Sequence, residues 1–374
     1  MVRQARPWWH VPAVFPKTVP FRKEAPGMRA KASVRVMAWV LPAMFALSSL
    51  AHAQVAETVT PREIRQNLFD TCFPTPTEGW VVGDLGRVFK TTDGGRTWQR
   101  QIVSGRLPFL GISCLDGKQA WISSTNGRVF KTSDGGATWT EQKTPVDRNL
   151  FKIAFVSPTR GTAVGDFGAI VHTEDGGATW EEIQLPEDFK LPDSALDQGI
   201  LPNDALLYGL SFANENTGWI AGEFGTILRT DDGGRTWKQQ VSGIESTLFG
   251  IDFLDENTGI AVGIDSVILR TDDGGATWKP IPSPFDERSY YEVALSGNYG
   301  WIVGGQGTVL VSTDGGKEWK QYPTPLRFAS EWFRGVSLSG DQGFFVGGAG
   351  LIYETKGAEA TLLRAAATSE EGNS

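Results

Sequence analysis

The chain repeats one short segment six times, and the first copy is TTDGGRTW at residues 91–98. The other copies are TSDGGATW (132–139), TEDGGATW (173–180), TDDGGRTW (230–237), TDDGGATW (271–278) and STDGGKEW (312–319). We call this segment the box; its aspartates are Asp93, Asp134, Asp175, Asp232, Asp273 and Asp314, spaced 41, 41, 57, 41 and 41 residues apart. A segment that recurs at a fixed period of this length indicates a repeat architecture.

A second marker precedes each box and occurs seven times. Its copies are GWVVG (79–83), AWISS (120–124), GTAVG (161–165), GWIAG (218–222), GIAVG (259–263), GWIVG (300–304) and GFFVG (343–347). Each unit is predicted to contain four short strands: a first strand such as 248–253, the marker as the second, a third such as 226–230 and a fourth such as 237–241. The seventh box has decayed to TKGAE at 355–359. Four antiparallel strands repeated every 40–45 residues or so are typical of a propeller blade. The sequence therefore predicts an all-β fold, a seven-bladed β-propeller of four-stranded antiparallel blades over residues 60–357.

The boxes favour a mechanical role over a catalytic one. Blades are arranged radially, so six equivalent aspartates cannot meet in one active site. Their Ser/Thr and Asp side chains can instead cap backbone N–H groups of a turn, and the two glycines supply positive φ angles. The tryptophan then packs against neighbouring strands. Chelation of Ca²⁺ by the aspartates is the alternative.

The N-terminal 53 residues have the features of an export signal. Basic residues follow Met28, an apolar run spans 36–50, and Ala51-His52-Ala53 gives a small-x-small cleavage site. We expect translation to start at Met28, cleavage after Ala53, and residues 1–27 to be an upstream extension. The apolar run is shorter than the ~20 residues of a membrane span, so we expect export to the periplasm without a stable membrane anchor.

Charge and missing motifs exclude several function classes. Residues 1–53 hold 8 of the 35 Lys and Arg but 1 of the 43 Asp and Glu, which leaves a net charge of −15 on the remainder. Such a surface repels phosphate backbones, so we expect no nucleic-acid partner. No catalytic, metal-binding or cofactor motif is present, and we expect none of these functions. His172, the one histidine after residue 53, is expected to be a solvated strand-end residue.

The box resembles the Asp-box (BNR) repeat of sialidase-like propellers. The combination of the GW-φ-V-G marker, a G-x-φ-φ-x-T strand and the box at a 41-residue period resembles the photosystem II stability/assembly factor family. This resemblance implies an exported, non-enzymatic propeller that acts in the lumen of oxygenic phototrophs on assembly of the reaction centre. Its partner would be a protein, a membrane-complex subunit in the envelope or thylakoid, and we expect a monomer. Related proteins also occur in bacteria without photosystems. A sialidase-like glycoside hydrolase or a glycan-binding module is the alternative.

One end of the propeller is the candidate partner surface. The turns between second and third strands and the connections between blades share this end. The connections carry Arg106, Arg148, Arg288 and Arg327, and Arg334 lies at the start of the last first strand. Arginine is enriched in binding hot spots, which favours a partner site, but local pairing with Asp147, Asp286 or Glu287 explains the arginines equally well. The 16-residue insertion at about 184–204 is expected to project from the same end.

Two features of the chain leave alternatives open. Either residues 360–364 or residues 55–60 complete the last blade, and part of the tail at 358–374 is expected to be disordered. Cys72 and Cys114 lie on the first strands of consecutive repeats, one register apart. Their side chains therefore point from opposite faces of equivalent strands, as a disulfide between adjacent blades requires. Export permits this bond, and two buried free cysteines are the alternative.

Overall fold

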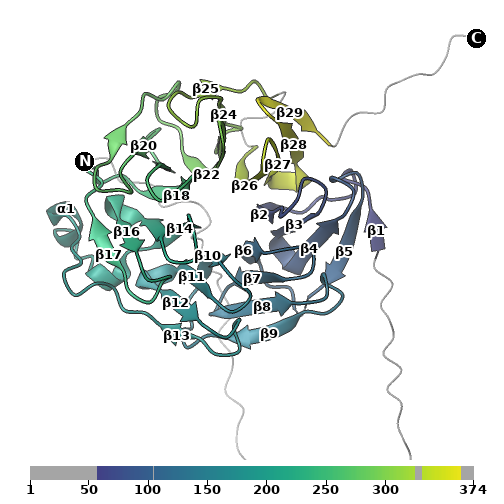
Figure 1. Ribbon diagram of the computed structural model, residues 1–374, viewed down its shortest axis with the longest axis horizontal. Helices are drawn as coiled ribbons and strands as arrows, with labels where there is room; N and C mark the ends of the chain where they lie inside the picture. The colour runs from purple at the N-terminus through teal and green to yellow at the C-terminus, as the bar shows by residue number, and fades with distance from the viewer. Residues whose placement is uncertain (1–56, 104, 325–330, 364–374) are drawn as a thin grey trace, which may run out of the picture. The chain divides into compact units, whose positions relative to one another are not determined.

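The computed structural model describes residues 57–103, 105–324 and 331–363. These residues form seven antiparallel sheets around a centre, in the order of the chain (Figure 1). The prediction of a seven-bladed β-propeller of four-stranded blades is confirmed. The expected signal sequence lies outside the described residues. In the described part of the chain, no helix has the length and apolar composition that a membrane crossing requires.

Each blade uses one repeat, whose four strands run outward in chain order. The innermost strands are β2 (Leu68–Cys72), β6 (Phe109–Cys114), β10 (Leu150–Phe155), β14 (Leu207–Phe212), β18 (Leu248–Phe253), β22 (Tyr290–Ser296) and β26 (Phe333–Ser339). The second strands are β3 (Gly79–Gly83), β7 (Ala120–Ser124), β11 (Gly161–Gly165), β15 (Gly218–Gly222), β19 (Gly259–Gly263), β23 (Tyr299–Gly304) and β27 (Gln342–Gly347).

The third strands are still largely buried, and the fourth strands are the most exposed of each blade. The third strands are β4 (Arg87–Thr91), β8 (Arg128–Thr132), β12 (Ile170–Thr173), β16 (Ile227–Thr230), β20 (Ile268–Thr271), β24 (Val309–Ser312) and β28 (Ile352–Lys356). The fourth strands are β5 (Trp98–Ile102), β9 (Thr140–Lys143), β13 (Glu181–Glu182), β17 (Lys238–Gln240), β21 (Lys279–Pro280), β25 (Lys320–Gln321) and β29 (Glu359–Leu362). β29 lies beyond residue 357, the predicted end of the propeller.

The structure decides how the ring closes. β29 pairs with β28 as the fourth strand of the last blade, after a turn in which Gly357 has a φ of +59°. β1 (Glu57–Val59) instead pairs with β5, on the outside of the first blade. The alternative in which residues 55–60 complete the seventh blade is therefore wrong. The ring closes through side chains, where Phe73 stacks on Phe344 with ring centroids 3.8 Å apart.

The hydrophobic core lies between blades, not within them. The described residues form seven buried clusters, and each one joins side chains of two adjacent blades. Trp121 of β7 stacks on Phe155 of β10 at 3.7 Å, and Trp219 of β15 stacks on Phe253 of β18 at 3.4 Å. A single blade has no core of its own, so folding requires that neighbouring repeats pack together.

Candidate functional site

The two ends of the propeller differ in chemistry. We call the end that carries the turns between second and third strands and the connections between blades the connection face. We call the opposite end, which carries the boxes, the box face. The candidate site is built on the connection face, because several independent features of the chain meet there.

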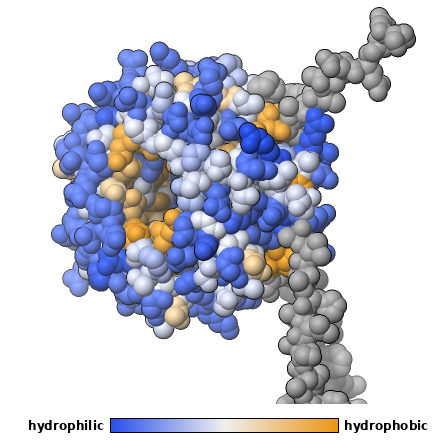
Figure 2. Space-filling view, turned by 45° about the vertical axis from the view of Figure 1, so that its right-hand side comes forward, coloured by the Kyte–Doolittle hydropathy of each residue, from blue (hydrophilic) through white to orange (hydrophobic). Residues whose placement is uncertain are grey.

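All six large hydrophobic side chains that are exposed within the described residues belong to the connection face. Their exposed fractions run from 47% to 83%. They are Leu85 and Phe167 in turns between second and third strands, Ile102 at the end of β5, Val241 just after β17, and Leu196 and Leu201 in the insertion. Figure 2 shows hydrophobic residues gathered around a hollow on the face turned toward the viewer. Exposed apolar residues that share one side of a molecule mark interaction surfaces.

Three of the connection-face turns hold a bulky residue in a backbone conformation that disfavours it. Leu85, Phe167 and Phe224 have φ angles of 54°, 51° and 55°. Asn126, Asp265 and Gln306 occupy the same place in three other blades, and asparagine and aspartate tolerate this region far better. Strained backbone of this kind is concentrated at functional sites. Leu85 and Phe167 are thus held out to solvent at a conformational cost, whereas Phe224 packs partly buried against the core.

The centre of the connection face carries a ring of side chains that sequence reasoning missed. In all seven innermost strands the second residue is an extra residue at a β-bulge, for example Phe69 between Leu68 and Asp70. A bulge re-aims the side chain it carries. We call these second residues of the first six blades the collar: Phe69, Leu110, Phe151, Tyr208, Phe249 and Tyr291. The alternation of large and small residues indicated which strand was innermost, but it could not reveal the bulge.

Neighbouring collar residues contact one another around the ring. The centroid distances are 5.3 Å for Phe151–Tyr208, 5.0 Å for Tyr208–Phe249 and 5.7 Å for Phe249–Tyr291. The seventh blade closes the series differently. Trp332 stacks on Phe69 at 6.0 Å, and the Arg334 guanidinium lies 5.3 Å from the centre of the same ring. The collar, Trp332 and Arg334 thus form a largely aromatic ring with one aliphatic member, Leu110, and one cation.

An ionic cluster lies one residue along from the collar. Lys152 Nζ is 3.1 Å from Asp70 Oδ1 and 2.6 Å from Glu292 Oε2. Asp70 Oδ2 also accepts a hydrogen bond from the Ile112 backbone N–H at 3.0 Å. Four blades therefore meet in these contacts, because the residues come from β2, β6, β10 and β22.

Burial and charge perturb the groups of this cluster in opposite directions. Burial raises the pKa of Glu292 to about 7, although the Lys152 ammonium opposes this shift. Burial also raises the pKa of Asp252, which accepts hydrogen bonds from Ser211 and the Leu295 N–H. Burial disfavours the Lys152 ammonium, but the carboxylates of Asp70 and Glu292 outweigh it and raise the pKa of Lys152. Every carboxylate of the cluster thus has a hydrogen-bond donor, which is what burial of charge requires.

The four predicted arginines that the structure describes lie on the connection face or in the central channel surrounded by the innermost strands, and they do not form one cluster. Arg106 is exposed, and the Arg288 guanidinium lies over the Phe285 ring. Arg148 donates from Nη1 to the Phe167 carbonyl at 2.7 Å and pairs through Nη2 with Glu182. Arg334 lies in the channel. Burial lowers the pKa of its guanidinium, although the negative charges of Asp70 and Glu292 act to raise it. Arg327 lies outside the described residues.

The insertion packs against the fourth blade. It contains the short helix α1 (Asp193–Leu196), and Phe189, Leu191 and Ala195 are buried in the cluster between the third and fourth blades. The Lys190 N–H donates to Gln239 Oε1 at 2.9 Å, and Gln239 Nε2 donates back to the Lys190 carbonyl at 2.8 Å. The insertion is therefore anchored on the outer strand of the fourth blade, with α1 at the rim of the ring (Figure 1), and its exposed residues include Leu196 and Leu201.

On the box face, each aspartate is used within its own turn. In the fifth blade Asp273 accepts hydrogen bonds from Thr271 Oγ1, the Thr277 N–H and Thr277 Oγ1, at 2.8, 2.8 and 2.7 Å. Thr271 Oγ1 in turn accepts from the Gly275 N–H. The same pattern recurs at Asp93, Asp134, Asp175 and Asp232, and Asp314 accepts backbone N–H groups in its place. Within the described residues, no group of three or more His, Cys, Asp and Glu side chains is placed to hold a metal ion.

The expectation for His172 is wrong, because its side chain is fully buried. The equivalent positions of other blades carry longer side chains, such as Lys131 and Arg229. These donate hydrogen bonds to the carbonyl of the first glycine in the box of the next blade. Imidazole is too short for that reach. It stays beneath Gly234 of the fourth-blade box, near Thr162 Oγ1 at 3.1 Å and Glu174 Oε1 at 2.9 Å.

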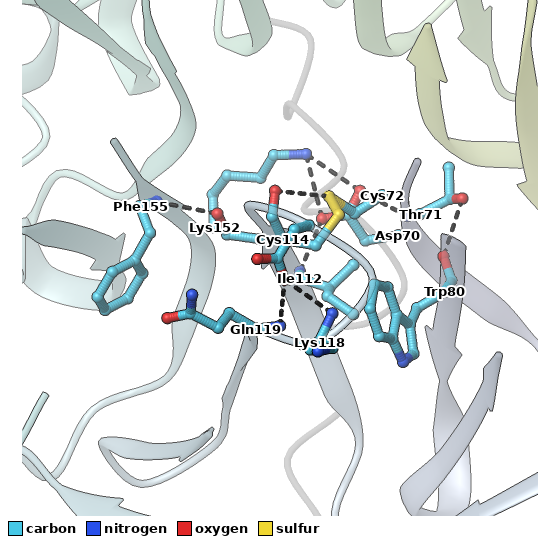
Figure 3. Close-up of a disulfide and its surroundings, with 12 residues drawn as sticks. Asp70, Thr71, Cys72, Trp80, Ile112, Cys114, Lys118, Gln119, Lys152 and Phe155 are labelled. Atoms are coloured by element: carbon cyan, nitrogen blue, oxygen red, sulfur yellow. Dashed lines mark hydrogen bonds and ion pairs between the residues drawn. A yellow bond between two sulfur atoms is a disulfide. The ribbon is translucent and has the colours of Figure 1, made fainter. Parts of the chain in front are cut away.

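Cys72 and Cys114 form a disulfide between the first and second blades in the structure. Figure 3 shows the bond beside the Lys152 side chain, which extends toward Asp70. The one-residue register difference between the two strands places the two sulfur atoms toward each other. The bond therefore joins two blades next to the ionic cluster.

Comparison with known proteins now identifies the family. The model of a family described as "Photosynthesis system II assembly factor YCF48" matches residues 57–143, 137–196 and 239–370. The chain belongs to this family. Among curated proteins, none matches the chain in sequence.

Solved structures of the family have the same fold. YCF48 bound to a D1 peptide is 21% identical with a TM-score of 0.62, over 81% of this chain and 97% of that chain. YCF48 from Cyanidioschyzon merolae is 20% identical with a TM-score of 0.64, over 79% and 96%. Virginiamycin B lyase from Staphylococcus aureus is 13% identical with a TM-score of 0.62, over 81% and 96%. At these identities the likeness concerns the fold, which is also used by enzymes.

Proposed function

We propose that this protein is an exported, non-catalytic scaffold whose connection face binds a subunit of a membrane complex, of the photosystem II kind, during assembly. Membership of the photosystem II assembly factor family supports photosystem II as the kind of complex. The similar structure of YCF48 bound to a D1 peptide supports a peptide segment of a subunit as the ligand. The N-terminal export signal expected from the sequence supports a place in the periplasm or, in an oxygenic phototroph, the lumen.

One observation carries the assignment of the face. The exposed large hydrophobic side chains of the described residues all belong to the connection face, and Leu85 and Phe167 are held there in unfavourable left-handed backbone. Single exposed hydrophobic residues scattered over a surface are ordinary, but their concentration on one face marks an interaction surface. The carboxylates Asp70 and Glu292 are bound to Lys152, which argues against their use as a glycosidase pair.

A binding experiment tests this proposal. Overlapping peptides that span the D1 subunit, with scrambled peptides as controls, are titrated against the purified protein by calorimetry. We expect one peptide region to bind, and Leu85→Ser together with Phe167→Ser to weaken binding about tenfold or more, as for hot-spot residues. The matched control is Lys118→Ser together with Lys317→Ser on the box face, which should leave binding unchanged.

Two results would contradict the proposal. Equal binding by both double variants would show that the connection face is not the site. Absence of binding to any D1 peptide, together with hydrolysis of fluorogenic glycosides or a specific glycan-array signal, would replace the scaffold by the glycosidase or glycan-binding alternative. Capture from envelope extracts then identifies the partner if the host lacks photosystems.

A further inference from the structure

The collar surrounds the mouth of the central channel on the connection face. Arg334 holds the equivalent place in the seventh blade, so seven side chains form the wall of the mouth. From Phe151 to Tyr291, the ring centres of neighbouring collar residues lie 5.3, 5.0 and 5.7 Å apart. Seven members at this spacing lie on a circle about 12 Å across, and a ligand atom needs about 3.5–4 Å to the carbon atoms of the wall. The mouth therefore has room for one side chain but not for an α-helix, whose diameter is about 10–12 Å.

The wall of the mouth is aromatic and partly exposed. All six collar residues are large apolar or aromatic side chains, and four of them are only half-buried. Phe151 is stacked on Tyr208, whereas Tyr208 meets Phe249 edge to face. A further aromatic ring in the mouth would therefore find both of the contact geometries that aromatic rings favour. Figure 2 shows a hollow of this kind, with hydrophobic residues around it.

The charged groups one residue along from the collar already have partners. The Lys152 ammonium has three protons and makes three contacts of 3.2 Å or less, two with Asp70 and one with Glu292. Both carboxylate oxygens of Asp252 accept hydrogen bonds from the protein, at 2.8 and 2.7 Å. A charged ligand would thus lose its water and gain no unpaired counter-charge from these groups, which is unfavourable. The chemistry below the mouth therefore selects an uncharged ligand.

We propose that the collar is the binding site for one uncharged aromatic side chain, which the partner peptide inserts into the channel mouth. This rests on the function proposed above and deepens it, because it specifies the kind of residue that the connection face recognises. The aromatic wall supplies the attraction, and the width of the mouth limits the ligand to one side chain. The paired charges below the mouth disfavour a charged one.

A small probe tests the site without the partner. N-acetyltryptophanamide is titrated into the purified protein, and NMR follows the aromatic carbon–hydrogen signals of the collar. We expect a dissociation constant of about 1 mM, with the largest shifts at collar rings. N-acetylleucinamide should bind about threefold more weakly, because it makes no ring-to-ring contact. N-acetyltryptophan, an anion, and tryptamine, a cation, should bind about tenfold more weakly, because their charge must be desolvated.

Three variants locate the binding of this probe. Leu110→Trp fills the mouth from the one aliphatic position of the collar and should weaken binding about tenfold or more, because the added ring takes the place of the ligand. Phe151→Leu keeps a large apolar side chain but removes one ring, and should weaken binding about threefold. The matched control Lys118→Trp adds the same ring as the first variant at an exposed position of the box face, and should leave binding unchanged.

The D1 peptide that binds the protein then tests how the site is used. Replacement of its aromatic residues by serine, one at a time, should identify one whose loss weakens binding about tenfold. If a D1 peptide binds and no such replacement weakens it, the collar proposal fails while the scaffold function stands. If the probe binds at the collar and no D1 peptide binds, the scaffold function fails while the aromatic site stands.

The wild-type titration is decisive by itself. The site is overturned if the probe shifts no collar signal, or if N-acetyltryptophan binds more tightly than the amide, since the Arg334 charge would then select the ligand. Either result holds even if Leu110→Trp does not fold.

Discussion

At the scale of single residues, the box shows how a short polar segment specifies a turn. Two side chains, a threonine or serine and an aspartate, satisfy the backbone N–H groups that the turn leaves open. The two glycines take positive φ angles, 70° and 87° at Gly274 and Gly275. The hydrogen bonds of the threonine and aspartate side chains lie inside the box, and the six copies adopt nearly the same geometry. The first glycine also bonds outside the box: the Gly274 N–H donates to the Asn257 carbonyl, and the Gly274 carbonyl accepts from Arg229 of the preceding blade.

Thr271→Val tests the threonine of the fifth box. The side chain is buried, and its replacement leaves the Gly275 N–H without an acceptor. We expect a loss of about 1–3 kcal/mol in the free energy of unfolding, measured by urea denaturation. Thr277→Val, at an exposed position of the same box, is the control and should cost less. Equal losses of unfolding free energy in Thr271→Val and Thr277→Val would show that the buried hydrogen bond from the Gly275 N–H does not dominate the stability of the turn.

The box aspartates should titrate at unusually low pH. Hydrogen bonds from the side chain and N–H of Thr179 lower the pKa of Asp175 to about 2, and those of Thr277 do the same for Asp273. Because the folded value lies below the ordinary 3.8, these groups add stability above about pH 4, which is lost as the pH falls through 2. Carboxyl NMR measures the midpoints, and values near 3.8 would contradict the turn geometry.

At the scale of strands, close packing around the centre explains the small residues of the innermost strands. A Cβ atom on Gly250 would lie 2.8 Å from the Cα atom of Glu292 in the next blade. Further out, tryptophans of the second strands lie beneath lysine or arginine side chains of the third strands, as at Trp80 with Lys90 and Trp219 with Arg229. Near the centre, the backbones of neighbouring innermost strands thus contact each other directly. Further out, tryptophan rings pack against lysine or arginine side chains.

Gly250→Ala tests the backbone approach. The atoms that the new methyl group would meet include backbone atoms of Tyr291 and Glu292, which cannot rotate away. We expect a loss of about 1–3 kcal/mol in unfolding free energy by urea denaturation. An unchanged midpoint would mean that adjacent innermost strands can separate without cost.

At the scale of the whole molecule, the ring is closed without a strand exchanged between its ends. The last and first blades meet through a hydrophobic cluster that includes Phe73, Trp98 and Phe344. The seventh blade takes all four strands from the C-terminal repeat, and the first blade gains β1 on its outside. Closure therefore depends on side-chain packing of the same kind as at the other six interfaces, together with a hydrogen bond from the Ala349 N–H to Asn67 Oδ1.

Phe344→Ala should weaken this closure. The ring is fully buried, and its removal should cost about 3–5 kcal/mol in unfolding free energy. Phe253→Ala, which removes a stacked ring at the interface of the fourth and fifth blades, is the comparison. We expect one cooperative transition and a similar cost for both variants. A separate early transition in Phe344→Ala would show that the closing interface is the weaker one.

The disulfide acts on the unfolded chain. The bond joins residues 42 positions apart, and the loop it closes should contribute about 2–4 kcal/mol to stability. Cys72→Ser together with Cys114→Ser should lower the unfolding free energy by this amount. Thiol titration of the denatured, unreduced wild-type protein should find no free thiol, and two free thiols per chain would exclude the bond.

The architecture could be predicted from the sequence alone, because short motifs within each repeat specify its turns and strands. The box, the second-strand marker and their period report on turns and strands within one repeat, so blade number and strand order could be predicted before any contact was known. The register argument for Cys72 and Cys114 rested on the same local periodicity. The connection face could also be located, because connection lengths follow from the order of the strands.

Contacts between distant repeats were decided only by the closed ring. The collar depends on a bulge, which leaves no mark in the alternation of residues, and the Asp70–Lys152–Glu292 cluster joins three blades that are not consecutive. His172 was placed wrongly because its burial comes from the next blade. The strand that completes the last blade was left open by the sequence, and the structure settles it by the pairing of β29 with β28. Each of these outcomes is set by which surfaces meet when seven blades share one centre, and a repeat read by itself does not contain that information.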